Sequence, residues 1–143
     1  MALSHLLYVS VASETLAREE LEDIRQVSED NNRARHITGV LFYSAGQFVQ
    51  LLEGEADDVR WLFDKVERDP RHHDVRLLVL HPVERRVFTE WGMGLLDLDH
   101  HGADAQRKLE RLVEIAGRGE VDEHGTPIEM VILSEFCMLL PAS

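Results

Sequence analysis

The chain contains 143 residues, of which 27 are acidic and 15 are basic, so its formal net charge at pH 7 is −12. That length suits one domain with a substantial core, and 44% hydrophobic with 29% charged residues is a globular composition. The acidic balance argues against direct binding of nucleic acid, because phosphate neutralisation needs a basic surface. No apolar run approaches the roughly 20 residues of a membrane span, so we expect no membrane partner.

Residues 3–11 are rich in strand formers and predict a first strand. A helix follows, with Ser13 or Thr15 as its expected N-cap. Its inner face is apolar at first and polar towards its end: Ala17, Leu21, Ile24, Ser28 and Asn31. Such a polar continuation of a buried face must find hydrogen-bond partners.

Residues 37–43 and 47–53 are two short strands joined by a turn at Gly46, a pattern typical of a β-hairpin. Asp57 opens a second helix, where an acidic side chain suits the helix dipole, and Pro70 ends it.

An almost unbroken apolar run at 75–80 predicts a central strand, and 91–96 predicts one more strand. The first hundred residues therefore follow the order β-α-β-β-α-β-β, which is the split βαβ order of an α+β, ferredoxin-like sheet with one extra strand. We divide the chain into 1–99 and a helical extension, 100–143, which belongs to the same compact unit.

The extension predicts two helices. The first covers 109–116, and the second begins at a capping box formed by Thr126 and Glu129, with Pro127 at the first helical position. Residues 128–140 are apolar nearly all round, so this helix needs cover on several sides. We expect both helices to lie on the sheet face opposite the first two helices, or on the matching face of a second subunit.

Two polar side chains interrupt apolar faces of the predicted sheet. Strand alternation places Tyr8 and Gln50 among apolar neighbours, where each is able to donate and accept a hydrogen bond. They either meet each other or a ligand, or are a core tyrosine with its hydroxyl at the rim and an edge glutamine in water. Asn31 and Asn32 also have two interpretations: they either contact a ligand or are ordinary residues at a helix end.

Metal and hydrolytic chemistry find little support in the sequence. His72-His73 and His100-His101 are adjacent pairs whose side chains point apart, and no spacing typical of zinc sites occurs, so we expect no metal site. Cys137 is the one cysteine, which excludes an internal disulfide. With no signal peptide expected at the N-terminus, these features predict a cytoplasmic protein.

Several segments together resemble the BLUF domain, a blue-light sensor that uses FAD, over roughly residues 3–97. Their order and spacing carry the resemblance, since any one alone is a weak signal. The segments are Leu-Tyr-Val-Ser at 7–10, Ser-Glu-Asp-Asn-Asn at 28–32, Ile-Thr-Gly-Val-Leu at 37–41, Gly-Gln-Phe-Val-Gln-Leu-Leu-Glu-Gly at 46–54, Asp-Pro-Arg-His at 69–72, Phe88, and Trp-Gly-Met-Gly at 91–94. His36 and Gly92 depart from the usual family pattern.

The resemblance implies that FAD binds non-covalently, with its ring between the first two helices and over the sheet; FMN or riboflavin is able to replace it in recombinant protein. It implies that Tyr8 is the electron donor and Gln50 the hydrogen-bond switch. Trp91 and Met93 belong to the strand that carries the signal. The other cofactor contacts that it implies are Ile24, Ser28, Asn31, Asn32, Phe48, Lys65, Val66, Arg71 and His72.

The implied function is that of a blue-light photoreceptor, not an enzyme, with a reversible red-shifted state that alters protein–protein contacts. A light-insensitive ferredoxin-like interaction module and a small flavin enzyme are the alternatives; the second is disfavoured because no substrate acid, base or electrophile is evident. No cyclase, phosphodiesterase or DNA-binding motif follows residue 100. The output is therefore expected to pass to an unidentified partner protein or to another copy of the chain, in a dimer or larger homo-oligomer.

Overall fold

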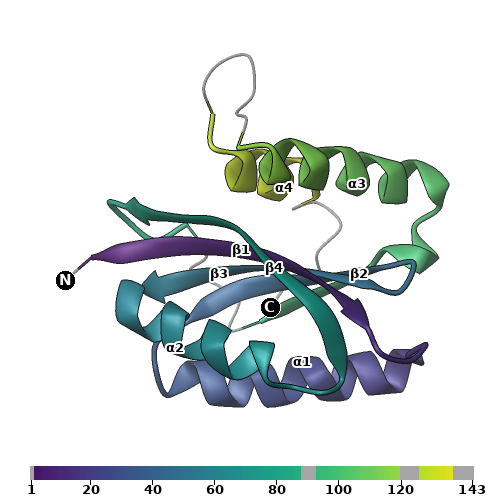
Figure 1. The fold of residues 1–143 in the computed structure, drawn as a ribbon, viewed down its shortest axis with the longest axis horizontal. Coiled ribbons are helices and arrows are strands. Elements are labelled where there is room, and N and C mark those ends of the chain that lie inside the picture. The colour runs from purple at the N-terminus through teal and green to yellow at the C-terminus, as the bar shows by residue number, and fades with distance from the viewer. Residues whose placement is uncertain (1, 88–92, 120–125, 137–143) are drawn as a thin grey trace.

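A computed structural model describes residues 2–87, 93–119 and 126–136, and it places helices on both faces of one sheet (Figure 1). The strands are β1 (Leu3–Ala12), β2 (Thr38–Ser44), β3 (Gln47–Glu55), β4 (His72–Val83) and β5 (Gly94–Asp97). The helices are α1 (Arg18–Arg33), α2 (Ala56–Glu67), α3 (Ala103–Gly117) and α4 (Ile128–Phe136), with a short 3-10 helix at Leu98–His100.

The strands lie in the order β4-β1-β3-β2-β5, so β1 and β3 are neighbours in the interior of the sheet. β1 pairs antiparallel with both β3 and β4, whereas β5 pairs parallel with β2. This arrangement confirms the predicted β-α-β-β-α-β-β order and the α+β class.

The prediction that 75–80 forms a central strand is wrong, because β4 lies at an edge of the sheet. Its apolar run has another cause: side chains on both of its faces are partly buried, although Leu77 remains exposed. Leu78 and Val79 pack against the cluster under α3 and α4, and Val75 and Leu80 pack against the cluster under α1 and α2. An edge strand with apolar contacts on both faces therefore has a sequence as hydrophobic as that of an interior strand.

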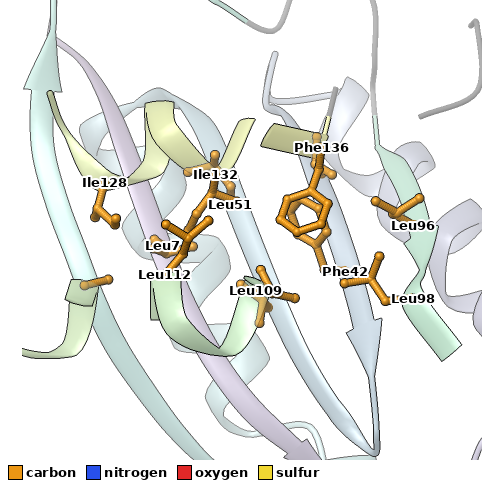
Figure 2. Close-up of a cluster of buried hydrophobic side chains, with 13 residues drawn as sticks. Leu7, Phe42, Leu51, Leu96, Leu98, Leu109, Leu112, Ile128, Ile132 and Phe136 are labelled. Carbon is orange, nitrogen blue, oxygen red and sulfur yellow. The ribbon is translucent and has the colours of Figure 1, made fainter. Parts of the chain in front are cut away.

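The two faces of the sheet carry separate hydrophobic clusters. On one face α1 and α2 cover sheet side chains that include Leu6 and Leu52, and Leu21 of α1 packs into the same cluster. On the other face α3 and α4 cover the cluster shown in Figure 2, where the rings of Phe42 and Phe136 meet edge to face at 5.5 Å. The predicted position of the two C-terminal helices, opposite the first two, is therefore confirmed.

Helix α1 begins later than the sequence predicts. Its N-cap is Ala17, whose backbone N–H donates to the Glu20 side chain (3.1 Å). Ser13, one of the two expected caps, donates instead to the carbonyl of Pro70 (2.9 Å). The loop after α2 thus uses the hydroxyl that the sequence pattern assigned to α1.

Helix α4 begins close to its predicted start, and the described part extends to Phe136. Residues 137–140 of the predicted helix, with Cys137, lie outside the described residues. Across the described part of the chain, no helix combines the length and the apolar character needed to cross a membrane.

Candidate functional site

Tyr8 and Gln50 are direct register partners on β1 and β3. Both are buried, at 3% and 4% exposure, and the Tyr8 hydroxyl donates to Gln50 Oε1. The other end of the carboxamide, Gln50 Nε2, lies 3.3 Å from Met93 Sδ. This contact excludes the alternative in which the Tyr8 hydroxyl lies at the rim of the core and Gln50 lies in water at a sheet edge. The two polar side chains meet inside the protein.

The phenol of Tyr8 is held in its neutral form. Burial raises its pKa above the ordinary value near 10, and the charge of Asp69 adds to the rise. Tyr8 is therefore a hydrogen-bond donor to Gln50 throughout the physiological pH range.

A cleft lies over this pair, between α1, α2 and the sheet. Its lining combines apolar side chains with a few polar groups, which is the usual character of a small-molecule site. The lining residues are Tyr8, Ile24, Ser28, Leu41, Phe48, Gln50, Val66, Asp69, Arg71 and His72. Eight of these ten are predicted site residues; Leu41 and Asp69 are the exceptions.

A second cleft shares Ile24 and Arg71 with the first. Its other lining residues are Ser13, Glu14, Leu16, Glu20, Asp23 and Pro70. Among the described residues that line either cleft, Arg71 is the one lysine or arginine. Its guanidinium pairs with Asp69, and this pairing lowers the pKa of the Asp69 carboxyl.

His72 has a defined orientation beside Tyr8. Its Nε2 lies 2.6 Å from the Val66 carbonyl and its Nδ1 lies 2.8 Å from Ser10 Oγ. Because a carbonyl only accepts, Nε2 carries the proton, and the Ser10 hydroxyl donates to Nδ1. The ring meets those of Tyr8 and Phe48 edge-on, at 6.4 and 6.2 Å, so it forms a fixed wall of the cleft.

Asn32 presents a buried carboxamide without a protein partner. The residue is 1% exposed, and neither Oδ1 nor Nδ2 has a hydrogen-bond partner. It lies one helical turn after Ser28, on the same side of α1. An unsatisfied buried polar group costs about 1–3 kcal/mol, so this position fits a ligand that offers a donor beside an acceptor.

Four described residues that the sequence predicts for the site do not line the cleft: Asn31, Asn32, Lys65 and Met93. Asn31 is exposed, and Lys65 is exposed beside Trp61, with Nζ 5.2 Å from the ring centre. Trp91 lies outside the described residues, whereas Met93 is buried against Gln50.

Arg25 is a residue that the sequence reasoning missed. Its Nη1 donates to the Met93 carbonyl (3.3 Å) and also pairs with Glu29 (2.7 Å). The i,i+4 spacing of Arg25 and Glu29 predicts their pairing, but nothing in the sequence indicates the contact with Met93, which is 68 residues away.

Solved structures with this architecture include three that the chain matches over most of their length. A BlrP1 BLUF domain matches with a TM-score of 0.72 and 30% identity, over 95% of this chain and 90% of that one. BlrB, a BLUF protein in its dark state, matches with a TM-score of 0.70 and 28% identity, over 82% and 87%. BlsA in its photo-activated state shares the fold, with a TM-score of 0.74 at 24% identity over 99% and 98%.

Curated relatives include larger proteins. Photoactivated adenylate cyclase subunit beta of Euglena gracilis is 38% identical over 90 residues, which are 62% of this chain and 10% of that protein. The blue light- and temperature-regulated antirepressor BluF of Escherichia coli is 29% identical over 102 residues, or 71% and 25%. The chain thus spans a tenth to a quarter of the length of these relatives.

These likenesses, with the cleft over Tyr8 and Gln50, define a light-sensing domain. The chain belongs to the BLUF family, sensors of blue-light using FAD, whose model matches residues 3–94. It is a BLUF blue-light photoreceptor domain. The matched structures that it covers nearly completely are sensor domains, whereas the cyclases that it resembles are much longer proteins.

Proposed function

We propose that this chain binds a flavin non-covalently in the cleft between α1 and α2 and reports blue light through a Tyr8–Gln50 switch. The observation that carries the proposal is the buried chain of contacts from Tyr8 and Gln50, which line the cleft, to Met93 behind them. FAD is the expected cofactor, with FMN or riboflavin able to replace it in recombinant protein.

The residues present fit a flavin. The ring system has a polar edge with an N–H between two carbonyls, and the orphaned Asn32 carboxamide supplies the complementary acceptor and donor. Ile24 and Val66, from α1 and α2, provide apolar contact for the ring faces. Arg71, between the two clefts, is placed for a phosphate of the cofactor tail.

A bound flavin would supply absorption of blue light and an acceptor for one electron and one proton. Tyr8 donates this electron and this proton and later regains them, so the protein undergoes no net oxidation. While the Tyr8 proton is absent, Gln50 loses its hydrogen-bond donor and is free to rotate or change tautomer. Each hydrogen bond exchanged is worth on the order of 1 kcal/mol, which is enough to bias a two-state element.

The change in Gln50 is positioned to reach the opposite face of the sheet. Met93 directly precedes β5, and two residues of the segment that follows, Leu96 and Leu98, belong to the cluster under α3 and α4. A shift at Met93 therefore alters the packing of these helices. We propose that they, or a second subunit or partner protein seated on them, carry the output.

The first test is the absorption spectrum of the purified protein in darkness and in blue light. The proposal requires yellow protein whose spectrum shifts slightly to the red and recovers in the dark, and acid precipitation must release all the flavin. Colourless protein favours a light-insensitive interaction module. Yellow protein that turns over a substrate without a reversible shift favours a flavin enzyme.

A further inference from the structure

A buried ionic cluster lies on the sheet face that α3 and α4 cover, away from the cleft. His5 of β1 is the register partner of Glu53 on β3 and of His81 on β4, so the three form a row across adjacent strands. Glu129, from the first turn of α4, reaches into this row. His5, Glu53 and Glu129 are at most 1% exposed, and His81 is 33% exposed.

The contacts within the cluster are short and shared. His5 Nδ1 lies 2.9 Å from Glu129 Oε2, and His81 Nε2 lies 2.8 Å from the same oxygen. The other His5 nitrogen, Nε2, lies 2.7 Å from Glu53 Oε2. Glu129 Oε1 is buried without a hydrogen-bond partner. A buried carboxylate with one unsatisfied oxygen is costly unless a further ligand uses it.

We propose that His5 Nδ1, His81 Nε2 and the carboxylate of Glu129 form a binding site for a divalent transition-metal ion, with Zn²⁺ as the best match. One ligand atom from each residue lies within 4.8 Å of the others. In a tetrahedral site with bonds of about 2.0–2.1 Å, ligand atoms are about 3.3 Å apart, so small side-chain movements suffice. Two imidazoles and one carboxylate are an established zinc ligand set.

The surroundings of the three ligands fit a metal as well. A ligating histidine usually donates its other N–H to a carboxylate, and Glu53 accepts at His5 Nε2. Glu53 is itself fixed, since its Oε2 accepts from the backbone N–H of Val87 (2.8 Å). The charge of a divalent cation also offsets the two buried carboxylates of Glu53 and Glu129.

A fourth ligand position is open to water. An open cleft adjoins the cluster and is lined in part by His81, Glu129 and Pro127. An ion bound to His5, His81 and Glu129 would join β1 and β4 to α4. His5 and Glu53 also stand three residues from Tyr8 and Gln50 on the same two strands, so the ion would hold the far face of the strands that carry the switch.

The test is a Zn²⁺ titration of the full-length, flavin-loaded protein after treatment with a chelator, by calorimetry and by competition with a chromophoric chelator. We expect one ion per chain with a micromolar or tighter Kd, and a rise in Tm with added Zn²⁺. H81A and E129Q should each weaken binding by about 100-fold or more, since loss even of a supporting contact costs 10- to 100-fold. Co²⁺ in place of Zn²⁺ should give visible bands of tetrahedral nitrogen and oxygen ligation.

The matched control is H73A, which removes a half-exposed histidine from the same strand and should leave zinc affinity unchanged. Because His81 is partly exposed, H81A decides the matter even if E129Q fails to fold. The proposal is overturned if wild-type protein takes up no Zn²⁺ at micromolar concentration. It is equally overturned if H81A binds Zn²⁺ as tightly as H73A, since the ion then sits on surface histidines.

Discussion

Gln50 Nε2 lies 3.3 Å from the sulfur of Met93, so the side chain that accepts the Tyr8 hydrogen bond also contacts the residue before β5. A thioether is a weak acceptor, and this contact is therefore easily exchanged for a stronger one. The Met93 carbonyl accepts from Arg25 of α1. Met93 is thus joined both to the proposed switch and to a helix that flanks the cleft.

The first prediction concerns transmission from Met93 to the far side of the sheet. Hydrogen exchange in α3 and α4 should differ between darkness and blue light, because Leu96 and Leu98 pack beneath these helices. The difference should vanish in Gln50→Leu. Identical exchange in both states of the wild-type protein, with the spectral shift intact, would mean that these helices are structural cover and that the output surface lies elsewhere.

The second prediction uses two neighbouring asparagines with opposite environments. Asn32→Ala should weaken flavin binding about 5- to 150-fold, the equivalent of the 1–3 kcal/mol that a buried polar group of the cofactor loses without its partner. Asn31→Ala, at an exposed position, is the control and should leave affinity unchanged. Flavin titration of both variants by fluorescence quenching measures the effect. Equal affinity of the two variants contradicts the assigned role of Asn32.

The third prediction concerns the charge between the two clefts. Arg71→Gln should lower affinity for FAD and FMN roughly two- to fivefold, the size of one partly exposed charge pair, and should leave riboflavin binding unchanged. The difference should shrink as salt is raised. Lys65→Gln removes an exposed cation outside both clefts and serves as the control. An equal loss for riboflavin would show that Arg71 contacts the ring or the sugar chain instead of a phosphate.

Strand alternation predicts that Tyr8 and Gln50 each lie on a largely apolar strand face, but their direct pairing depends on the register of β1 against β3, which the β2–β3 hairpin does not fix. Most of the cleft lining was predicted from the family resemblance, and helical periodicity had already placed Ile24 and Ser28 on the inner face of the first helix. Neither source revealed Arg25, whose contact with Met93 joins residues far apart in the chain.

Glu129 shows a second limit. The sequence pattern Thr126-Pro127-Ile128-Glu129 predicts a capping role for it, and the helix does begin there. Its carboxylate nevertheless lies buried against His5 and His81. The three residues come from α4, β1 and β4, so no spacing along the chain indicates the cluster. The edge position of β4 was missed because the hydrophobicity of a strand depends on how far its two faces are buried. It does not depend on the number of strands that pair with it.

The fourth prediction concerns alkaline pH. Burial and the charge of Asp69 raise the pKa of Tyr8 in the folded protein above its ordinary value near 10. The unfolded chain therefore loses this proton at a pH where the folded protein still keeps it, and stability falls as pH rises above 10. Tyr8→Phe should lack this part of the fall. Its free energy of unfolding relative to wild type should be constant from pH 7 to about 9 and then increase.

Denaturant unfolding of both proteins across this pH range gives the comparison. Titration of the cofactor and of the other side chains is common to both, so the difference isolates Tyr8. If the difference in free energy of unfolding between the two proteins stays constant to pH 11, the phenol titrates alike in the folded and unfolded states. That result would contradict the description of Tyr8 as a buried neutral donor.

The central claim is that Tyr8 and Gln50 form the light-driven switch. Its most direct test is the light-minus-dark absorption spectrum of Tyr8→Phe and Gln50→Leu beside the wild-type protein. Both variants should retain flavin, because each removes a polar group with little loss of apolar contact, and both should lose the reversible red shift. A normal, reversible red shift in flavin-loaded Gln50→Leu would contradict the account.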